Sequence, residues 1–391
     1  MASDPGSQPE ASANGQLQTP IEAASQSAQL APVGKPPTHR PLTVLRALRG
    51  VLMLALLVVS AFIFLTSCIP IWAFLRLLKW SWGRGFASHL FGYWLSMWVL
   101  MFEYVNGTKL VFSGESVPPK ERVLIMCNHL TEVDWMYLWC LAYRKQSVGA
   151  VKYALKATVR HAPIFGWAFH CMEFLLLERK WELDKDTIRT VMSSFRNRRD
   201  PLWEVVFPEG TDFNQKKKER SQAYAREHNL PVLEHCLLPR VKGFHACLEP
   251  VRDAIDAVYD LTVAYVPRPP TFVDNLFGLD PAEVHIDVRR ILPAAIPSKE
   301  DEASTWMYGV FKRKDEMLEQ FYKRNAFPSR QIDEGEISML QAVVGYVLFT
   351  LSSVIAIWLL VTSRGFFAYV VLSAIFSTTL VTLNWMPGGR Q

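Results

Sequence analysis

The chain has little that would support a metal centre or a disulfide framework. Its six cysteines lack the short paired spacing of zinc-binding or redox motifs. Six of its histidines likewise show no recognised ligand spacing. We therefore expect reduced thiols in a domain facing the cytosol, no metal site and no bound cofactor. The cysteines are Cys68, Cys127, Cys140, Cys171, Cys236 and Cys247, and the histidines are His161, His170, His228, His235, His245 and His285.

Charge is also sparse along the chain. Charged residues make up 20% of the 391 positions, hydrophobic residues make up 50%, and the formal net charge is +5. Such a composition is unusually apolar for a soluble enzyme. Basic residues gather on both sides of the first long apolar run, which suits an anionic membrane surface better than nucleic acid. They are Arg40, Arg46 and Arg49 before the run, and Arg76, Lys79 and Arg84 after it.

Three apolar runs are long enough to cross a bilayer. Residues 51–74 contain no charge, and about 20 apolar residues span a hydrocarbon core of ~30 Å. This run starts too far into the chain for a cleaved signal, so we expect a retained anchor. Residues 339–362 and 365–385 are separated by two residues only, which predicts a transmembrane hairpin.

The other segments outside the middle of the chain have different characters. Residues 86–104 are apolar and rich in tryptophan, so they either pair with the anchor or lie in the membrane interface. Residues 1–38 are rich in Ser, Ala, Gln, Pro and Gly, which predicts a disordered tail. We therefore divide the chain into the tail, an anchor region over 39–108, a middle domain over 109–330 and a C-terminal membrane hairpin over 331–391.

The middle region alternates between strand and helix patterns. Strands are predicted near residues 123–126, 173–177, 203–207, 258–264 and 284–291, with helical stretches between most of them. This alternation indicates an α/β fold in which helices flank a central sheet. Functional sites of such sheets collect at the carboxyl ends of the strands.

The first of these strands runs directly into Asn128-His129, and Asp134 follows five residues after the histidine. Thr131 and Asp134 have the spacing of a helix N-cap and its third helical residue, which predicts a helix over roughly 132–143. The turn lets the carboxylate face the imidazole, as a proton-transfer pair requires. Taken alone, Asp134 as a simple capping residue is an equally good interpretation.

The third strand ends in Phe207-Pro208-Glu209-Gly210-Thr211. Backbone N–H groups of such a turn can point at one oxyanion, and Thr211 adds a hydroxyl donor. Glu209 would repel an anion unless it holds a nearby cation or backbone donor in position. A tight turn without any ligand is the competing interpretation of these residues.

Basic side chains lie close to two further strands. Arg179 follows the second predicted strand, and Arg240 and Lys242 precede the fourth. Arginine can clamp a phosphate with two parallel hydrogen bonds, so Arg179 and Arg240 are candidate phosphate ligands. Surface arginines without a ligand are the alternative for each.

Together these blocks resemble the glycerolipid acyltransferases, which share His-x4-Asp followed by Phe-Pro-Glu-Gly-Thr. The runs TEVDWMYLW, VFPEGTDF, AVYDLTVAY and EVHIDVRRIL are similar to the plant lysophosphatidate acyltransferases related to lysocardiolipin acyltransferases. The resemblance covers roughly residues 41–327. One departure is Leu130, which stands where that branch usually has Arg.

The resemblance implies a multi-pass enzyme of the endoplasmic reticulum membrane. It would transfer a fatty acyl group from acyl-CoA to the sn-2 hydroxyl of lysophosphatidic acid, giving phosphatidic acid. His129 would act as general base, and Asp134 would orient it and stabilise its charged form. Arg179, Glu209, Gly210 and Thr211 would bind the acceptor phosphate, while Asn128, Arg240 and Lys242 are further candidates.

Four alternatives remain open at this point. The acceptor could be another lysophospholipid, such as lysophosphatidylinositol, lysophosphatidylglycerol or monolysocardiolipin. Water could replace the acceptor, which would make the enzyme a hydrolase. Cys127 could form an acyl-cysteine before transfer. A catalytically inactive membrane scaffold would predict loss of the motif residues, all of which are present.

Overall fold

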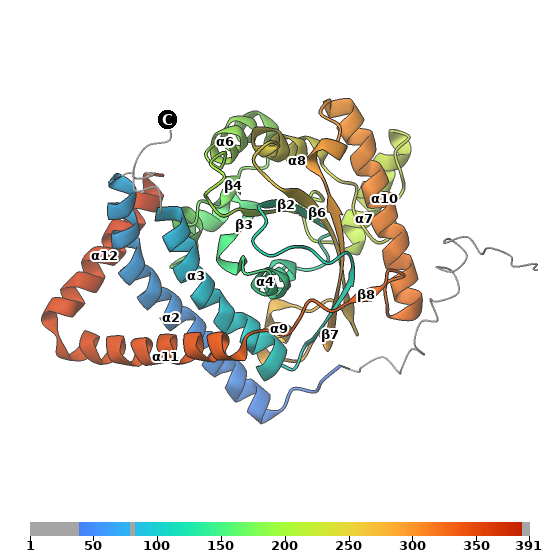
Figure 1. The fold of residues 1–391 in the computed structure, drawn as a ribbon. Coiled ribbons are helices and arrows are strands. Elements are labelled where there is room, and N and C mark those ends of the chain that lie inside the picture. The colour runs from blue at the N-terminus through green and yellow to red at the C-terminus, as the bar shows by residue number, and fades with distance from the viewer. Residues whose placement is uncertain (1–38, 79–82, 385–391) are drawn as a thin grey trace, which may run out of the picture. The chain divides into compact units, whose positions relative to one another are not determined.

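A computed structural model describes residues 39–78 and 83–384 of the chain. The predicted disordered tail over residues 1–38 lies outside the described residues, and so does Trp385 at the end of the predicted second hairpin span. Figure 1 shows the sheet with helices on both of its faces and two helices at the carboxyl end that extend away from it.

The centre of the structure is an eight-stranded sheet in the order β4-β3-β5-β2-β6-β7-β1-β8. Five neighbouring strands from β4 to β6 are parallel, β7 is antiparallel to β6, β1 is parallel to β7, and β8 is antiparallel to β1. This mixed sheet confirms the predicted α/β class. The strands are β1 Lys109–Gly114, β2 Val123–Cys127, β3 Val151–Lys156, β4 Leu175–Leu177, β5 Trp203–Val206, β6 Ala257–Val266, β7 Glu283–Ile291 and β8 Gln331–Ile332.

The five predicted strands correspond to β2, β4, β5, β6 and β7. The prediction missed β1, β3 and the two-residue β8. Polar residues interrupt the apolar pattern of β3 at both Lys152 and Lys156, which hid it from a search for apolar runs. Strand β2 was the easiest to recognise because it is buried on both faces, as a central strand of a parallel sheet must be.

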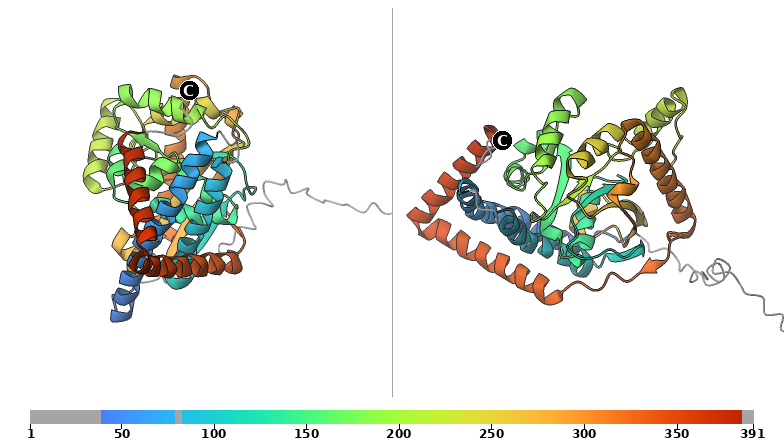
Figure 2. Two further views of the ribbon diagram at one scale, coloured as in Figure 1. Left: turned by 90° about the vertical axis from the view of Figure 1, so that its left-hand side faces the viewer. Right: turned by 45° about the horizontal axis from the view of Figure 1, so that its top comes forward.

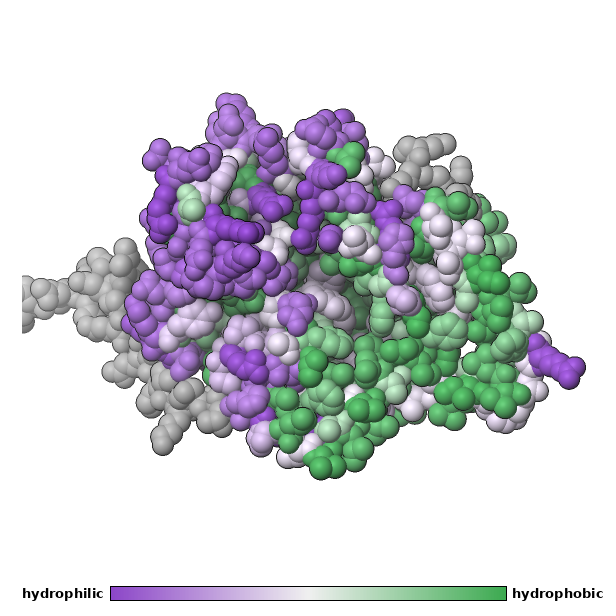
Figure 3. Space-filling view, turned by 180° about the vertical axis from the view of Figure 1, so that it is seen from behind, coloured by the Kyte–Doolittle hydropathy of each residue, from purple (hydrophilic) through white to green (hydrophobic). Residues whose placement is uncertain are grey.

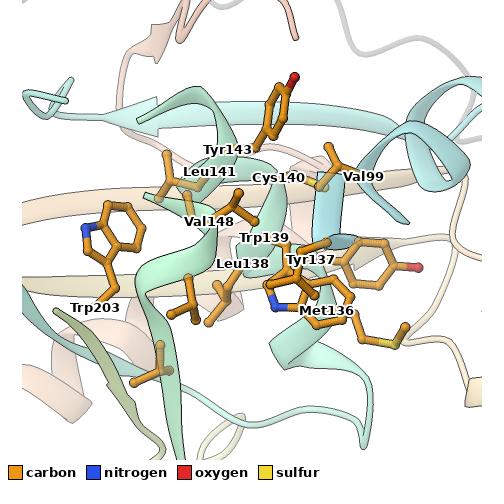
Figure 4. Close-up of a cluster of buried hydrophobic side chains, with 14 of the residues drawn as sticks. Val99, Met136, Tyr137, Leu138, Trp139, Cys140, Leu141, Tyr143, Val148 and Trp203 are labelled. Atoms are coloured by element: carbon orange, nitrogen blue, oxygen red, sulfur yellow. The ribbon is translucent and has the colours of Figure 1, made fainter. Parts of the chain in front are cut away.

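Alternate residues of β2 point into two separate cores. Ile125 and Cys127 belong to the core that contains α4 and α3 (Gly83–Leu100), whereas Leu124 and Met126 belong to the core under α6, α8 and α10. Figure 4 shows how α4 fills the first core with closely packed aromatic and aliphatic side chains. The helices of this domain are α4 Asp134–Arg144, α5 Phe165–Cys171, α6 Trp181–Ser193, α7 Gln215–Glu227, α8 Val241–Leu248, α9 Phe272–Phe277 and α10 Glu300–Arg324.

Short helical turns join several of these elements. A π-helical turn covers Met101–Val105, and 3₁₀ turns cover Val148–Ala150, Ala157–His161, Glu249–Val251 and Pro293–Ala295.

Three of the described helices are long and apolar enough to cross a membrane, in agreement with the three predicted spans. They are α2 Val44–Leu77, α11 Met339–Thr362 and α12 Arg364–Thr382. The segment predicted to pair with the anchor or lie in the interface forms α3 Gly83–Leu100 and the π-helical turn after it. Most of the second half of α3 is buried, and it packs against α11. Seen from behind, apolar side chains gather on the side of the apolar helices, and polar ones gather on the other side (Figure 3).

The helix that follows β2 begins later than predicted. Its first helical residue is Asp134 and its N-cap is Val133, so the prediction that Thr131 is the N-cap is wrong. The Thr131 hydroxyl donates to the carbonyl of Pro270 instead of capping the helix. A contact with a residue distant in sequence thus replaces the local cap.

Candidate active site

The sheet brings the predicted motif residues to one edge. Strands β4, β3, β5, β2 and β6 are parallel, so their carboxyl ends lie side by side. His129 follows β2, the turn with Glu209 follows the adjacent β5, and Arg179 follows β4. Because neighbouring strands are ~4.8 Å apart, Arg179 starts only about 10 Å from the β5 turn.

His129 and Asp134 face one another across the turn after β2. The Nδ1 atom of His129 lies 2.9 Å from Oδ2 of Asp134. The same oxygen accepts the backbone N–H groups of Leu130, at 2.6 Å, and Thr131, at 3.0 Å. Asp134 therefore holds the backbone before α4 and the imidazole at the same time, so the capping and orienting roles coexist.

The exposure of the two side chains differs in a way that suits proton transfer. The Asp134 side chain is fully buried, whereas 18% of the His129 side chain is exposed. An ionised carboxylate beside Nδ1 favours the tautomer with its proton on Nδ1, which leaves Nε2 as an acceptor. No described residue forms a hydrogen bond with Nε2. The imidazole can therefore take a proton from a ligand at this edge.

Tyr265, near the end of β6, is a site residue that the sequence analysis missed. Its hydroxyl donates to Oδ1 of Asp134 at 2.5 Å, so both carboxylate oxygens have hydrogen-bond donors. Burial, followed by the charge of Asp134, raises the pKa of Tyr265 well above its ordinary value and keeps the hydroxyl protonated. The run AVYDLTVAY predicts only that Tyr265 lies on a strand. No pattern in the neighbouring sequence indicates its contact with Asp134, which is 131 residues away.

Glu209 lies under the histidine and has its own backbone partners. Its Oε1 accepts the N–H of His129 at 2.9 Å, and its Oε2 accepts the N–H of Leu237 at 2.8 Å. The side chain is buried, and burial raises its pKa to about 8. Glu209 was expected to bind the acceptor phosphate, but both oxygens are occupied by backbone donors. Glu209 therefore holds the turn of His129 in place by accepting its backbone N–H.

A second layer of contacts fixes the loop that contains Leu237. Asp315 of α10 accepts the backbone N–H groups of three consecutive residues, Glu234, His235 and Cys236, at distances between 2.6 and 3.0 Å. This loop therefore presents the Leu237 N–H to Glu209 in a set position. The position of the turn with His129 thus depends on α10 through the carboxyl groups of Asp315 and Glu209.

Asn128 was a further candidate for substrate binding, and its position excludes this role. Its side-chain amide donates to the carbonyl of Val263 at 3.0 Å, and its carbonyl accepts the N–H of Val263 at 2.8 Å. The side chain is fully buried. Asn128 ties the end of β2 to β6, on which Tyr265 lies, and so sets the spacing between Asp134 and its tyrosine.

The imidazole is also held by an aromatic neighbour. The rings of His129 and Phe207 are stacked with centroids 4.4 Å apart. The backbone N–H of Phe213 donates to the carbonyl of His129 at 2.7 Å. Residues on both sides of the β5 turn therefore limit the movement of the His129 side chain.

The remaining candidates surround the β5 turn without filling it. Gly210 has φ +72°, a conformation that glycine adopts without strain, and a Cβ there would lie 3.1 Å from Nε of Arg240. Arg240 is exposed and lies over this turn, while Thr211 donates its hydroxyl to Asp212. Arg179 is exposed, and no described carboxylate forms an ion pair with it.

Lys242 lies farther along, in the first turn of α8, and its ammonium group is 3.9 Å from a carboxylate oxygen of Glu300. Both side chains are largely exposed. Among the described residues, no group of three or more His, Cys, Asp or Glu side chains is placed to hold a metal ion. The chemistry available at the edge is therefore that of an oriented imidazole with cationic side chains around it.

A family model described as acyltransferase matches residues 109–267, and a second, described as acyltransferase C-terminus, matches residues 274–349. The probable 1-acyl-sn-glycerol-3-phosphate acyltransferase 5 of Arabidopsis thaliana is 45% identical over 298 residues, which are 75% of this chain and 78% of that protein. The chain belongs to the acyltransferase family. Its first family match contains β1 to β6 and with them the whole candidate site.

A second relative agrees with the predicted branch of the acyltransferases. Lysocardiolipin acyltransferase 1 of Mus musculus is 34% identical over 252 residues, which are 64% of this chain and 67% of that protein. A solved 1-acyl-sn-glycerophosphate acyltransferase from Thermotoga maritima has a TM-score of 0.43 and 16% identity, covering 70% of this chain and 98% of that one. The resemblance to plant 1-acyl-sn-glycerol-3-phosphate acyltransferases related to lysocardiolipin acyltransferases is confirmed.

Cys127 is poorly suited to form an acyl-enzyme in this acyltransferase. It is fully buried at the end of β2, and burial raises the pKa of its thiol well above the ordinary value. A thiol attacks a thioester only as the thiolate, which burial disfavours. Direct transfer assisted by His129 is the simpler chemistry for this geometry.

Proposed function

We propose that this acyltransferase moves a fatty acyl group from acyl-CoA to the sn-2 hydroxyl of lysophosphatidic acid, giving phosphatidic acid and CoA. The observation that carries the proposal is the orientation of His129, whose Nδ1 is held by Asp134 and whose Nε2 is left to accept a proton. The names of the relatives support the choice of acceptor.

In the proposed reaction, Nε2 of His129 removes the proton of the acceptor hydroxyl as its oxygen attacks the thioester carbonyl. The new ester C–O bond forms, the C–S bond breaks, and the CoA thiolate takes the proton back from the imidazolium. Asp134 stabilises the imidazolium while it exists. No acyl-enzyme is needed, and the same base serves both proton transfers.

The acceptor phosphate would lie over the β5 turn. Arg179 and Arg240 supply positive charge there, and the backbone and hydroxyl of Gly210 and Thr211 supply donors. Glu209 would not bind the phosphate itself but would hold the turn in place through its hydrogen bonds to backbone N–H groups. Lys242 is a weaker candidate because Glu300 lies beside it.

Another lysophospholipid is the second candidate acceptor, since lysocardiolipin acyltransferases are among the relatives. Leu130 stands where the branch usually has Arg, and its side chain is buried in the core beside α4. A buried leucine offers no charge to a headgroup phosphate. Residue 130 therefore does not discriminate between the candidate acceptors, and the acceptor panel described next decides between them.

An acceptor panel tests the proposal. Microsomes containing the full chain are given one labelled acyl-CoA with lysophosphatidate, lysophosphatidylinositol, lysophosphatidylglycerol or monolysocardiolipin. We expect labelled phosphatidic acid as the main product and its loss in His129→Ala. Free fatty acid as the only product would indicate a hydrolase, and no turnover with any acceptor would indicate an inactive scaffold.

The same preparation tests the localisation that we propose, a multi-pass protein of the endoplasmic reticulum with its catalytic domain in the cytosol. Three apolar helices support membrane association. Protease added outside sealed microsomes should cleave the loops of the sheet domain, for example near the exposed residues of α7. Protection of that domain in sealed vesicles would place it in the lumen.

A further inference from the structure

A cleft of about 650 Å³ lies at the edge of the sheet opposite to His129. It is lined by the residues that lead into β2, β3 and β5, by one face of α3 and by the segment before α11. Because β2, β3 and β5 are parallel, the residues before them lie at the other edge from the residues after them. The five residues of β2 alone separate the two edges by about 16 Å. The cleft is therefore distinct from the candidate active site.

Helix α3 forms one wall of the cleft. It contributes five residues at the spacing of a single helical face, which are Gly85, Ser88, His89, Gly92 and Tyr93. Gly149, before β3, approaches this face so closely that a Cβ on Gly92 would lie 3.3 Å from its backbone nitrogen. Figure 2 shows α3 beside α2, with α11 running across both. This wall is therefore held by backbone contact with the sheet domain.

The opposite wall is fixed by contacts between segments that are far apart in the sequence. The buried guanidinium of Arg122 donates to three backbone carbonyls of other loops, including that of Asp200 at 2.8 Å. The hydroxyl of Tyr143 donates to the carbonyl of Ser338 at 3.1 Å, which ties α4 to the segment before α11. The cleft is thus a product of the tertiary structure and not of one loop.

Two cationic side chains at the cleft have no partner. Lys120 and Arg199 are exposed, and neither side chain forms an ion pair or a hydrogen bond with any residue of 39–78 or 83–384. Glu336 is the one lining carboxylate without an ion pair in the described parts of the chain. Unpaired cations therefore exceed unpaired anions, which favours an anionic ligand. The other charged lining residues are Glu121, which pairs with Arg290, Arg144 with Glu103, Arg198 with Asp256, Asp200 with Arg84, and Arg122 with its carbonyls.

The register of the sheet places the two unpaired cations on adjacent loops. Val123 of β2 and Trp203 of β5 are register partners, and Lys120 and Arg199 precede them by three and four residues. Lys120 has φ +61°, which is unfavourable for a residue with a side chain, and its N–H donates to the carbonyl of Lys145 at 2.9 Å. Arginine can bind a phosphate with two parallel hydrogen bonds, and lysine adds a point charge. The pair has the composition of a phosphate site.

We propose that this cleft is a second ligand site, which holds a phosphate-bearing molecule between Lys120 and Arg199. A phosphate group alone would leave most of the cleft empty, so the ligand carries an organic part. That part lies against His89 and Tyr93, whose rings meet edge to face with centroids 4.9 Å apart. The phosphate comes either from a soluble phosphomonoester or from a lipid headgroup. In both cases the ligand ties together the loops that lead into β2 and β5, the strands that end in the two motif turns.

Equilibrium binding to the full chain in a neutral detergent tests the site. The probes are labelled glycerol 3-phosphate, for a soluble source, and labelled dioctanoyl phosphatidic acid, for a lipid source. The variant Lys120→Asn, Arg199→Gln removes both cations, and asparagine tolerates the positive φ of residue 120. We expect one saturable site for at least one probe to weaken at least about 10-fold in this variant, because it loses charged hydrogen bonds. The probe that is affected identifies the source.

Two control variants separate the cleft from other cations. Arg196→Gln with Lys216→Gln removes the same charge from exposed positions outside the cleft, so it should bind both probes as the parent does. Arg179→Gln with Arg240→Gln removes the cations around the β5 turn and should retain the site that the cleft variant loses. Unchanged binding in the cleft variant, or an equal loss in the first control, would overturn the proposal.

Hydrogen exchange locates the ligand without relying on turnover. With the bound probe at 100 times its Kd, backbone amides of residues 116–122 and 197–202 should exchange at least about 10-fold more slowly in the parent and in His129→Ala. Slower exchange confined to the segments after β2, β4 and β5 would place the ligand at the other edge and overturn the proposal. Protection at the cleft in a parent protein that transfers no acyl group would overturn the proposed function alone.

Discussion

At the scale of single residues, the site depends on two carboxyl groups whose oxygens all accept hydrogen bonds. Asp134 receives His129, two backbone N–H groups and the hydroxyl of Tyr265, while Glu209 receives two backbone N–H groups. These contacts fix the backbone of the turn and the carboxylate that holds the imidazole. In the proposed reaction, a base held in this way needs little reorganisation when it accepts a proton.

Tyr265→Phe tests the least obvious of these contacts. The substitution removes one donor to Asp134 and leaves the ring in place. Because a hydrogen bond to a charged group contributes about 1.5–3 kcal/mol, we expect kcat to fall about 10-fold with little change in KM. Without the hydroxyl of Tyr265, the negative charge of Asp134 is less neutralised, so Asp134 stabilises the imidazolium of His129 more. The acidic limb of the pH–kcat profile should therefore move to higher pH.

Tyr259→Phe is the matched control for this experiment. Tyr259 lies on the same strand, and its hydroxyl also donates to a carboxylate, that of Glu121, at 2.5 Å. It lies six residues before Tyr265, near the start of β6. Its loss should affect stability but not the shape of the pH–kcat profile. The same profile shift in both variants would contradict a positioning role for Tyr265.

Glu209→Gln should change how stability depends on pH. Burial raises the pKa of Glu209 to about 8, whereas an unfolded glutamate has a pKa of about 4.3. Between these values the folded protein holds a proton that the unfolded chain has released, so this residue makes the free energy of unfolding fall as pH rises. Glutamine cannot titrate. In detergent, Tm of the parent should therefore decline more between about pH 5 and about pH 8 than Tm of the variant, and equal declines would contradict the assignment.

At the scale of elements, the register of the sheet places two ionisable residues side by side that are far apart in the sequence. Lys152 of β3 is the register partner of Glu204 of β5, and both side chains are buried. Lys152 donates to the carbonyl of Met172 at 2.7 Å, whereas neither carboxylate oxygen of Glu204 has a hydrogen-bond partner. Burial lowers the pKa of Lys152 and raises that of Glu204.

This buried pair should be coupled energetically. Glu204 has Lys152 as its charged neighbour, so removing Lys152 leaves a buried carboxyl without that interaction, whereas replacing both residues by apolar ones can be neutral. We expect the double variant Lys152→Met, Glu204→Leu to unfold at a higher temperature than either single variant. Additive losses of Tm in the double variant would show that the two groups do not interact.

At the scale of the whole molecule, the apolar helices are packed directly onto the sheet domain. Helix α3 lies against the 3₁₀ turn before β3, and a Cβ on Gly149 of that turn would lie 1.7 Å from the carbonyl oxygen of Ser88. The two backbones can approach this closely only because residue 149 has no side chain. The position of α3 on the sheet domain is therefore set by backbone contact.

Gly149→Ala should disrupt this contact. A backbone oxygen cannot move aside as a flexible side chain can, so we expect a loss of about 1–3 kcal/mol, at the upper end of this range, seen as a lower Tm or poor recovery from membranes. Gly85→Ala, on α3 itself, is the control, because a Cβ there meets nothing within 4 Å. Its effect should stay below about 1 kcal/mol. Normal stability of Gly149→Ala would mean that the close backbone contact between Gly149 and Ser88 does not hold α3 in place.

Much of the architecture could be predicted from the chain alone, because its signals are local. A span is recognised by its length and lack of charge, and three such helices are present. Strand β2 and the His129 and Glu209 turns could be found because each occupies a few consecutive residues. Strand β3 and the start of α4 were not predicted correctly, since each depends on contacts made with distant parts of the chain.

The sequence by itself determined the class of fold, the apolar helices and the order of the two motif blocks. Only the tertiary structure decided which atoms those motifs contact. Tyr265 reaches Asp134 because β6 lies beside β2, and Glu209 finds Leu237 because Asp315 holds the loop between them. Residue type and spacing specify local conformation, whereas strand order and register follow from how the two cores pack, which no short segment encodes.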